Sequence, residues 1–212
     1  MSAGEATRTP MTMLLPFFTR REAQSFRQLR GRVYLRPPLG RDYRAWAAVR
    51  EESRSFLTPW EPTWAHDALT RGAYRRRLRH YVQEWRQDNG YAFFVFTQEG
   101  DQLVGGITLS NLRRSVAQTA AVGYWVGESH ARQGYMTEAL LALADFSFGR
   151  IGLRRLEAAC LPQNQASRKL LEKVGFQYEG YARDYLRIDG EWRDHLLYAL
   201  LREDPRGESQ DG

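Results

Sequence analysis

The sequence predicts an α/β (α+β) domain of seven strands and four helices, and three observations lead to this fold class. First, the chain has 212 residues, of which 42% are hydrophobic and 26% charged, as in one soluble globular domain. Second, apolar residues recur at helical spacing in some segments and at strand-like spacing in others. Third, glycines and prolines separate these segments, and no internal repeat divides the chain.

Two tails are expected to flank the domain. Residues 1–30 are polar and rich in arginine, without clear periodicity, and we expect a flexible N-terminal extension there. The domain is expected at 31–203, with a disordered tail at 204–212. No apolar run reaches the ~20 residues that a membrane span needs. The single cysteine, Cys160, suits a reducing compartment, so a cytoplasmic protein without a membrane partner is expected.

The first half of the domain is predicted to hold one strand and two helices. Residues 33–35 are strand-like, and the proline pair that follows stops the strand. Residues 40–53 and 67–87 show helical spacing of their apolar side chains. The segment 56–64 between them contains two prolines and is predicted to be a loop.

From residue 91 onwards the hydrophobic period is mostly that of strands. Gly175 follows an amphipathic stretch and is predicted to end its helix. Asp189-Gly190 lies between two strand-like runs and is typical of a tight hairpin turn. The predicted elements are strands at 91–97, 102–111 and 119–127, a helix at 136–148, a strand at 153–161, a helix at 165–175, and hairpin strands at 181–188 and 191–201.

The chain is basic, with a formal net charge of +6. Lys169 and Lys173 are its only lysines, so the charge reflects an arginine bias of the whole chain. The densest basic run, Arg75-Arg76-Arg77 with Arg79, falls in a predicted helix and is interpreted as a solvated helix face. No specific nucleic-acid recognition is expected, although the charge leaves a ribosomal surface open as a partner.

The stretch "HARQGYMTEALL" at 130–141 is a polar turn that runs into an apolar helix. Backbone N–H groups at a helix N-terminus are unpaired and partly positive, so such a turn can bind an anion without lysine or metal. Gly134 would let the backbone approach a ligand closely. No Walker motif or three-glycine dinucleotide fingerprint is present, which leaves a diphosphate held by amides as the candidate ligand. Taken alone, the turn favours a plain loop.

Three further stretches change this interpretation. "YWVG" at 124–127, "N-x-x-S" at 164–167 with the following "LLEKVGF", and "DYLRIDGEWRDH" at 184–195 resemble the RimJ/RimL branch of the GNAT acetyltransferase superfamily. That branch acetylates the α-amino groups of ribosomal proteins, and its RimJ type is described as an alanine N-acetyltransferase. The resemblance implies a mixed central sheet of about seven strands, flanked by helices, with a cleft where strand 119–127 splays from strand 153–161.

The resemblance also implies acetyl-coenzyme A as co-substrate and no metal. The amides of the turn would hold its pyrophosphate. Val126 would pair with the pantetheine arm and polarise the thioester carbonyl, and Asn164 would hydrogen-bond to the pantetheine. The implied cofactor-binding residues are Trp125, Val126, Arg132, Gln133, Gly134, Tyr135, Met136, Thr137 and Asn164.

Three positions depart from the superfamily pattern. Ala131 replaces the first Gln or Arg of the turn, and Met136 replaces its last Gly or Ala. Because the turn binds through its main chain, Met136 is compatible with that role, and Arg132 or Gln133 is available to replace the missing side chain. Leu171 stands where many members carry a tyrosine that acts as general acid.

Acceptor chemistry favours a modest base. An α-amino group has a pKa near 7.7–8.0, so roughly a tenth is neutral at pH 7, and a carboxylate acting through water suffices. Glu61 in "PWEP" is the first candidate, with a structural role in its loop as the alternative. Asp184 is the second, with cross-strand pairing to Arg193 or Arg187 as the alternative. Glu128 is a third option.

The leaving thiolate needs a proton donor. Ser167 is the candidate, and it is also expected in the cap or first turn of its helix. Tyr185 and Tyr198 are alternatives, although tyrosines in strands usually serve packing. Cys160 is expected to be a small buried residue, so transfer is predicted to be direct, in a ternary complex.

The predicted function is acetyl transfer from acetyl-coenzyme A to the N-terminal amine, with alanine first, of a ribosomal protein. One alternative keeps the fold and acetylates a small amine, such as an antibiotic or a polyamine, because one fold hosts many substrates. Another is a non-catalytic basic protein that binds ribosome or RNA, with affinity that falls steeply with salt.

Overall fold

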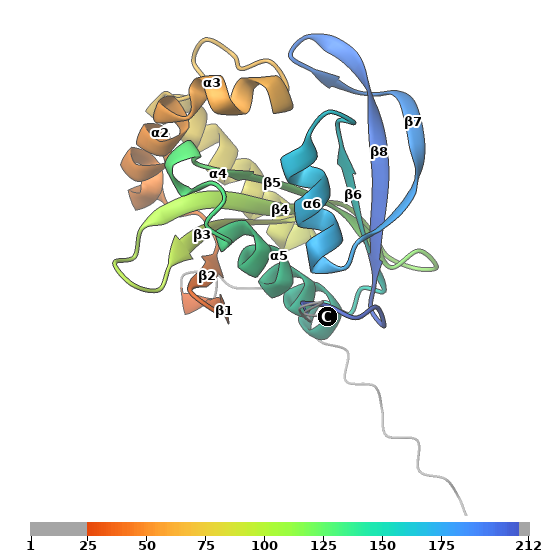
Figure 1. Ribbon diagram of the computed structural model, residues 1–212. Helices are drawn as coiled ribbons and strands as arrows, with labels where there is room; N and C mark the ends of the chain where they lie inside the picture. The colour runs from red at the N-terminus through yellow and green to blue at the C-terminus, as the bar shows by residue number, and fades with distance from the viewer. Residues whose placement is uncertain (1–24, 208–212) are drawn as a thin grey trace, which may run out of the picture.

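One mixed sheet of eight strands organises the molecule, seen in a computed structural model that describes residues 25–207 (Figure 1). The strand order is β1-β2-β3-β4-β5-β6-β8-β7, and within these residues only the β5–β6 pair is parallel. The predicted fold class is therefore confirmed. The strands are β1 (Gln28–Arg30), β2 (Val33–Arg36), β3 (Tyr91–Thr97), β4 (Leu103–Arg113), β5 (Thr119–Val126), β6 (Arg155–Cys160), β7 (Gln177–Ile188) and β8 (Glu191–Leu201).

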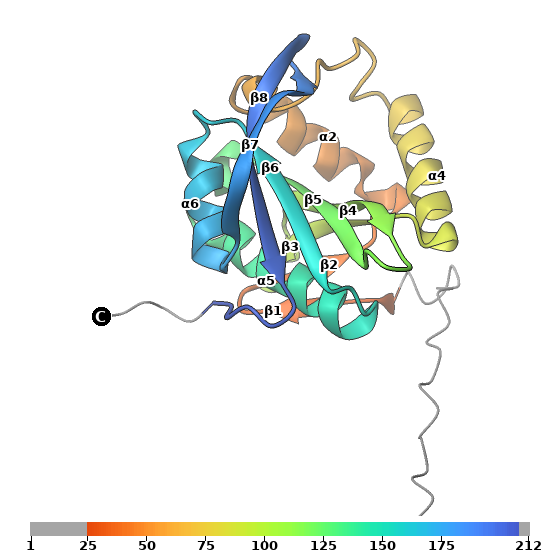
Figure 2. The same ribbon diagram turned by 90° about the vertical axis from the view of Figure 1, so that its right-hand side faces the viewer.

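Helices cover both faces of the sheet. Helices α5 and α6 lie on one face, and α2 and α4 lie on the other (Figures 1 and 2). The helices are α2 (Tyr43–Glu52), α3 (Arg54–Leu57), α4 (Arg71–Gln87), α5 (Tyr135–Asp145) and α6 (Gln165–Val174), with the short turns η1 (Gly40–Asp42), η2 (Thr58–Trp60), η3 (Glu128–His130) and the π-helical η4 (Phe146–Arg150).

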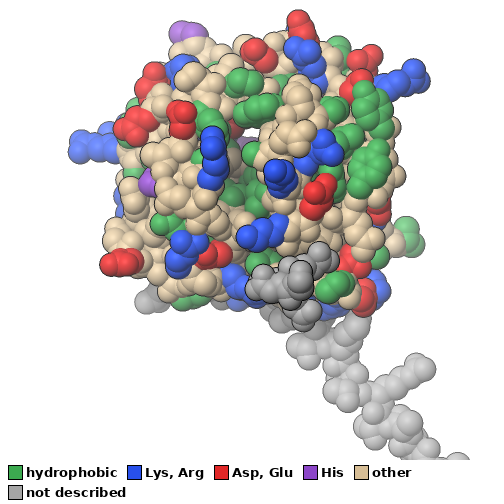
Figure 3. All heavy atoms as spheres, in the orientation of Figure 1, with side chains coloured by type: hydrophobic (Ala, Val, Ile, Leu, Met, Phe, Trp, Pro, Cys, Tyr) green, Lys and Arg blue, Asp and Glu red, His purple; other side chains and the backbone are tan. Residues whose placement is uncertain are grey.

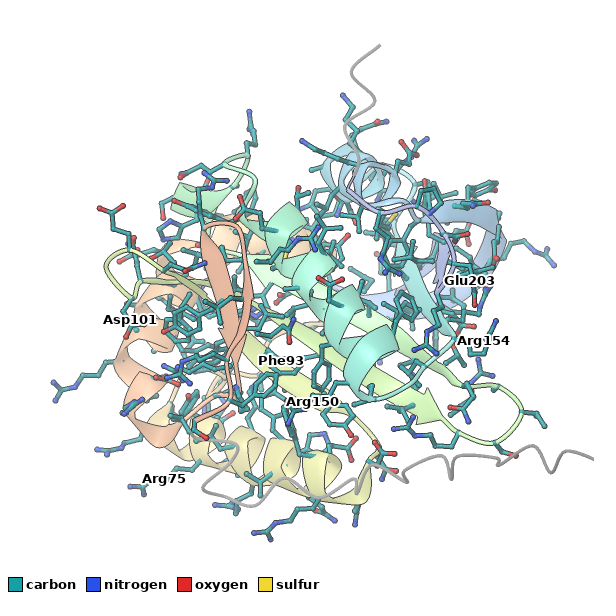
Figure 4. All side chains as sticks on the ribbon, turned by 90° about the horizontal axis from the view of Figure 1, so that it is seen from below. Arg75, Phe93, Asp101, Arg150, Arg154 and Glu203 are labelled. Atoms are coloured by element: carbon teal, nitrogen blue, oxygen red, sulfur yellow. The ribbon has the colours of Figure 1, made fainter. Side chains whose placement is uncertain are left out.

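Two apolar clusters form the core, one on each side of the sheet. Strand β2 shows how: Val33 and Leu35 enter the cluster under α5, while Tyr34 enters the cluster under α2 and α4. Side chains that alternate along a strand produce this division. Phe93 of β3 (Figure 4) links α4 to η4, because the centre of its ring lies 5.3 Å from that of Trp85 and 5.1 Å from that of Phe146.

The sheet begins before the predicted domain start at residue 31. Strand β1 pairs with β2, and Phe26 ahead of it is only 7% exposed. The last residues of the expected extension are therefore part of the fold, because a three-residue strand on an edge needs no periodic pattern to reveal it. The rest of the expected extension, 1–24, and the end of the expected tail, 208–212, lie outside the described residues.

The predicted loop at 56–64 is partly helical. Helix α3 and the turn η2 continue to Trp60, and extended backbone begins at Glu61. Pro59 lies in the first turn of η2, where its missing N–H is not required. The helix predicted from 67 begins later, at Arg71, because Thr70 caps it and accepts a hydrogen bond from the Ala73 N–H at 3.2 Å.

Candidate active site

Strands β5 and β6 separate part-way along the sheet. They pair only between Thr119–Val122 and Arg155–Ala158, whereas β5 remains paired with β4 as far as Val126. One edge of β5 is therefore open towards β6 beyond Val122. The splay expected between strands 119–127 and 153–161 is confirmed, and the space-filling view shows a furrow on this face with basic side chains along its rim (Figure 3).

Val126 directs its main chain into this opening. The next N–H, from Gly127, donates to the Val104 carbonyl of β4 at 2.9 Å. Successive N–H groups of an extended strand point to opposite edges, so the Val126 N–H points away from β4. This is the direction that hydrogen bonding to an extended ligand arm requires.

The turn before α5 presents a row of amides. The N–H groups from Arg132 to Thr137 donate no hydrogen bond to any residue between 25 and 207. Arg132 (φ 60°) and Gly134 (φ 84°) both adopt left-handed backbone, which turns the chain sharply at the helix start. Unpaired amides and the positive end of the helix dipole together form an anion-binding site.

Arg32 holds this turn in place. It lies just before β2, and its Nη2 donates to the Gln133 carbonyl at 2.7 Å while its Nε donates to Glu138 Oε1 at 2.8 Å. Its guanidinium also lies 4.9 Å from the centre of the Tyr135 ring. The pairing neutralises Glu138, a carboxylate that would otherwise oppose an anion at the N-terminus of α5. Sequence reasoning missed Arg32, because no motif links it to a turn about a hundred residues away.

Two of the expected cofactor residues turn their side chains away from the opening. The Met136 side chain is buried, with Cε packed against Gly105. The Trp125 indole lies over Gly106 and within 4.9 Å of the Arg50 guanidinium, on the α2 side of the sheet. These residues offer only their main chain to a cofactor.

At the other end of the opening, two hydroxyl groups meet. Tyr124 Oη of β5 lies 2.7 Å from Ser167 Oγ of α6. Asn164 Oδ1 accepts a hydrogen bond from the Ser167 N–H at 3.0 Å, so Asn164 caps the helix that carries the serine. Burial raises the pKa of the Tyr124 phenol, which therefore stays protonated at neutral pH.

Tyr124 is a site residue that sequence reasoning did not assign. It belongs to "YWVG", and it follows the buried Val122 by two positions, so alternation along the strand places it on the α6 side. The tyrosines considered as donors instead lie elsewhere. Tyr198 donates to Glu172 Oε1 at 3.1 Å, and Tyr185 is exposed beside the His195 ring.

Cys160 lies at the end of β6, near Ser167. Its side chain is buried, as expected, and burial raises the pKa of its thiol. The neutral thiol is a poor nucleophile.

Glu61 lies on the opposite side of the sheet, in a network with α2. Its Oε1 and Oε2 accept hydrogen bonds from Arg50 Nη1 and Nη2 at 2.8 and 2.6 Å, and the Trp64 indole N–H donates to Oε2 at 2.8 Å. The Asp189 N–H of the terminal hairpin donates to the Glu61 carbonyl at 3.0 Å. Glu61 therefore joins the loop, α2 and the hairpin, in line with the structural interpretation.

The other two carboxylates are more isolated. Asp184 is exposed in a bulge of β7 with φ 46°, and its N–H donates to Asp194 Oδ1 at 2.9 Å. The cross-strand partners considered for it bind other groups, since Arg193 pairs with Glu191 and Arg187 donates to a turn carbonyl. Glu128 is exposed in η3.

A small cavity of about 270 Å³ lies where η2, the end of β6 and the terminal hairpin meet. Its lining residues are Pro59, Trp60, Leu161, Gln163, Ile188, Asp189 and Arg193. The cavity is therefore shared by the segment that carries Glu61 and the hairpin that carries Asp184.

Within residues 25–207, no group of three or more His, Cys, Asp or Glu side chains is arranged to hold a metal ion. None of the helices in this part of the chain is long and apolar enough to cross a membrane.

Comparisons with known proteins agree with this geometry. The family model for the acetyltransferase (GNAT) domain matches residues 32–177. The probable N-acetyltransferase YjcK of Bacillus subtilis is 35% identical over 81% of this chain and 95% of its own length. The [ribosomal protein uS5]-alanine N-acetyltransferase of Escherichia coli is 34% identical over 77% of this chain and 85% of its own.

Among solved structures, Mycobacterium smegmatis RimJ in complex with CoA-disulfide aligns with a TM-score of 0.77 and 34% identity, covering 81% of this chain and 82% of that one. The cofactor named there fits the open edge of β5 and the unpaired amides before α5. The chain thus belongs to the GNAT acetyltransferase family, and it is an N-acetyltransferase that uses acetyl-coenzyme A.

Proposed function

We propose that the chain acetylates the N-terminal α-amino group of a ribosomal protein, with alanine as the first residue, in the cytoplasm. The observation that carries the proposal is the site itself, with unpaired amides at one end of the open β5 edge and paired hydroxyls at the other. The acceptor class rests on the similarity to the uS5-alanine enzyme over more than three quarters of the chain.

The cofactor would lie along β5. The amides from Arg132 to Thr137 would bind its pyrophosphate, with Gly134 giving the close approach. Val126 would donate its N–H to the thioester oxygen, where negative charge develops as the amine attacks. Asn164 would add a hydrogen bond from its amide nitrogen, since Oδ1 already caps α6.

Transfer would be direct. The amine nitrogen forms a bond to the thioester carbon, the carbon–sulfur bond breaks, and the sulfur leaves with the electron pair. Ser167 would give its hydroxyl proton to that sulfur, and Tyr124 would replace it through their hydrogen bond. Tyr124 supports this role because it keeps its proton at neutral pH.

The amine must also lose a proton. Glu61 is the best supported of the three carboxylates, because its Arg50 partner lies 4.9 Å from the ring of Trp125 on the cofactor strand. It would act through water, or it would hold the amine in place. Asp184 would act only if a bound peptide drew the hairpin bulge towards the opening.

The test is incubation with acetyl-coenzyme A and two hexapeptides, one with a free N-terminal alanine and one with the same sequence and a blocked N-terminus. Mass spectrometry should find one added acetyl group on the free peptide alone. Acetylation of a lysine side chain in the blocked peptide, or of small amines only, would refute the proposed acceptor.

A further inference from the structure

Helix α4 carries a line of arginines on its outer side. Arg71, Arg75, Arg79 and Arg86, named here the arginine stripe, are all exposed. Steps of four and seven residues bring side chains to the same side of an α-helix. Figure 4 shows Arg75 pointing away from the ribbon into solvent.

Within residues 25–207, none of the four stripe arginines lies within ion-pair distance of a carboxylate. Two other arginines of the same helix do have partners, since Arg76 pairs with Asp67 and Arg77 lies over the Trp46 ring. The stripe is therefore a place where positive charge accumulates without compensation from the described chain.

This arrangement opposes the helix that carries it. Arg71 and Arg75, and Arg75 and Arg79, are like charges four residues apart, which repel each other on a helix surface. Arg71 also lies in the first turn of α4, at the positive end of the helix dipole. A bound polyanion would relieve both repulsions, whereas a neutral or cationic partner would relieve neither.

We propose that the arginine stripe binds the phosphate backbone of RNA without reading its sequence. Guanidinium groups form paired hydrogen bonds with phosphate oxygens. At 1.5 Å per residue, the stripe extends about 22 Å in a straight line, which suits a regular polyanion better than a compact acidic group. The choice of RNA over other polyanions rests on the proposed ribosomal acceptor.

The stripe leaves the active site open. The opposite side of α4, with Arg77, Tyr81 and Glu84, lines a cavity of about 470 Å³ against β3 and β4. Strand β4 pairs with the cofactor strand β5. RNA on the outer side of α4 would therefore face away from the sheet and leave the open edge of β5 uncovered.

The test measures RNA binding directly, so its result does not depend on acetylation. Fluorescence anisotropy would follow the full chain binding to a labelled 20-base-pair RNA duplex. The logarithm of the affinity should fall with the logarithm of salt concentration with a slope of about −3.6, as four phosphate contacts on a duplex require. The variant R75E/R79E/R86E should bind at least about tenfold more weakly and with a shallower slope.

The matched control is K169E/K173E/R183E, which makes the same charge change at exposed positions of α6 and β7. It should retain RNA affinity within about threefold. The milder R75Q/R79Q/R86Q variant should show an intermediate loss. The temperature of thermal unfolding should not fall in the stripe variants, because they remove the like-charge repulsion between arginines along α4. Acetylation of a short peptide should stay at the native level.

Equal weakening by both glutamate variants would overturn the proposal, because net charge alone would then explain binding. Full RNA affinity in the stripe variant would also overturn it. So would binding of polyglutamate as tightly as RNA, which would indicate an acidic protein surface as the partner.

Discussion

The two sides of the proposed active site use different kinds of groups, main-chain amides on one side and side chains on the other. The side that we propose for the cofactor uses main-chain groups, the Val126 N–H on an open strand edge and the amides before α5. The side that we propose for the acceptor uses side chains that bind one another, with Arg50, Glu61 and Trp64 in one network. Binding by main-chain groups is compatible with many side chains, so the proposed cofactor side can keep its geometry while its sequence changes. Binding by side chains depends on residue identity, so the proposed acceptor side can differ with the substrate.

The largest expected effect tests the main-chain side. Gly134→Val should lower the affinity for coenzyme A at least about 100-fold, or about 2.7 kcal/mol. Gly134 has φ 84°, a conformation that strains a β-branched residue, and a Cβ there would also lie 3.0 Å from Arg32 Nη2, which holds the turn. Calorimetry measures the affinity. Gly40→Val is the control, since its Cβ would meet nothing within 4 Å, and it should retain the native affinity. An unchanged affinity in Gly134→Val would show that the turn is misassigned.

The next effect concerns the paired hydroxyls. Ser167→Ala should lower kcat about 100-fold with little change in KM for acetyl-coenzyme A, because the leaving sulfur loses its proton donor. Tyr124→Phe should lower kcat about tenfold. The double variant should be no slower than Ser167→Ala, since the two groups act as one unit. Steady-state kinetics on a peptide acceptor measures these losses. Losses that add in the double variant would show that Ser167 and Tyr124 act independently.

The side-chain network should matter for stability. Arg50→Met should lower the free energy of unfolding by about 2–4 kcal/mol, because it leaves the largely buried Glu61 carboxylate without its guanidinium partner. Denaturant unfolding measures the loss. Arg154→Met is the matched control, since its pair with Glu203 is exposed at the edge of the molecule (Figure 4) and should change nothing measurable.

Glu61→Gln separates the two roles of that residue. It keeps the shape and one hydrogen-bond acceptor, so stability should fall less than in Arg50→Met, while kcat/KM for the peptide should fall about tenfold or more if the carboxylate handles the amine. Unchanged kinetics with reduced stability would leave Glu61 a purely structural residue.

The smallest effect is a pH dependence near the cofactor turn. Burial lowers the pKa of His130 in η3. In the unfolded chain the pKa of a histidine is near 6.5, so below that pH the unfolded chain binds a proton at His130 more readily than the folded chain does. The contribution of the neutral imidazole to folding stability is therefore complete above pH 6.5 and is lost as the pH falls through the folded pKa. His130→Gln should reduce the loss of thermal stability between pH 7 and pH 5. A pH profile of thermal stability identical to that of the native chain would contradict this prediction.

The sequence predicted local features well where one segment carries its own signal. Gly175 ends α6 in left-handed backbone with φ 107°, and Asp189-Gly190 forms the hairpin turn, as predicted. Strand β1 and the helical turns α3 and η2 were missed, because short elements depend on their neighbours. Tyr124 was missed for a related reason, since its partner Ser167 belongs to another element and only the packing of α6 on the sheet brings the two together.

The sequence by itself determined the fold class, the family resemblance, the glycine at the turn and the strand that carries Val126. These follow from periodicity, backbone freedom and local motifs, which act over a few residues. Only the tertiary structure decided which side chains meet. Arg32 reaches Gln133 and Glu138, Tyr124 reaches Ser167, and Glu61 is already paired with Arg50. Such contacts join elements far apart in the chain, and the packing of helices on the sheet sets them.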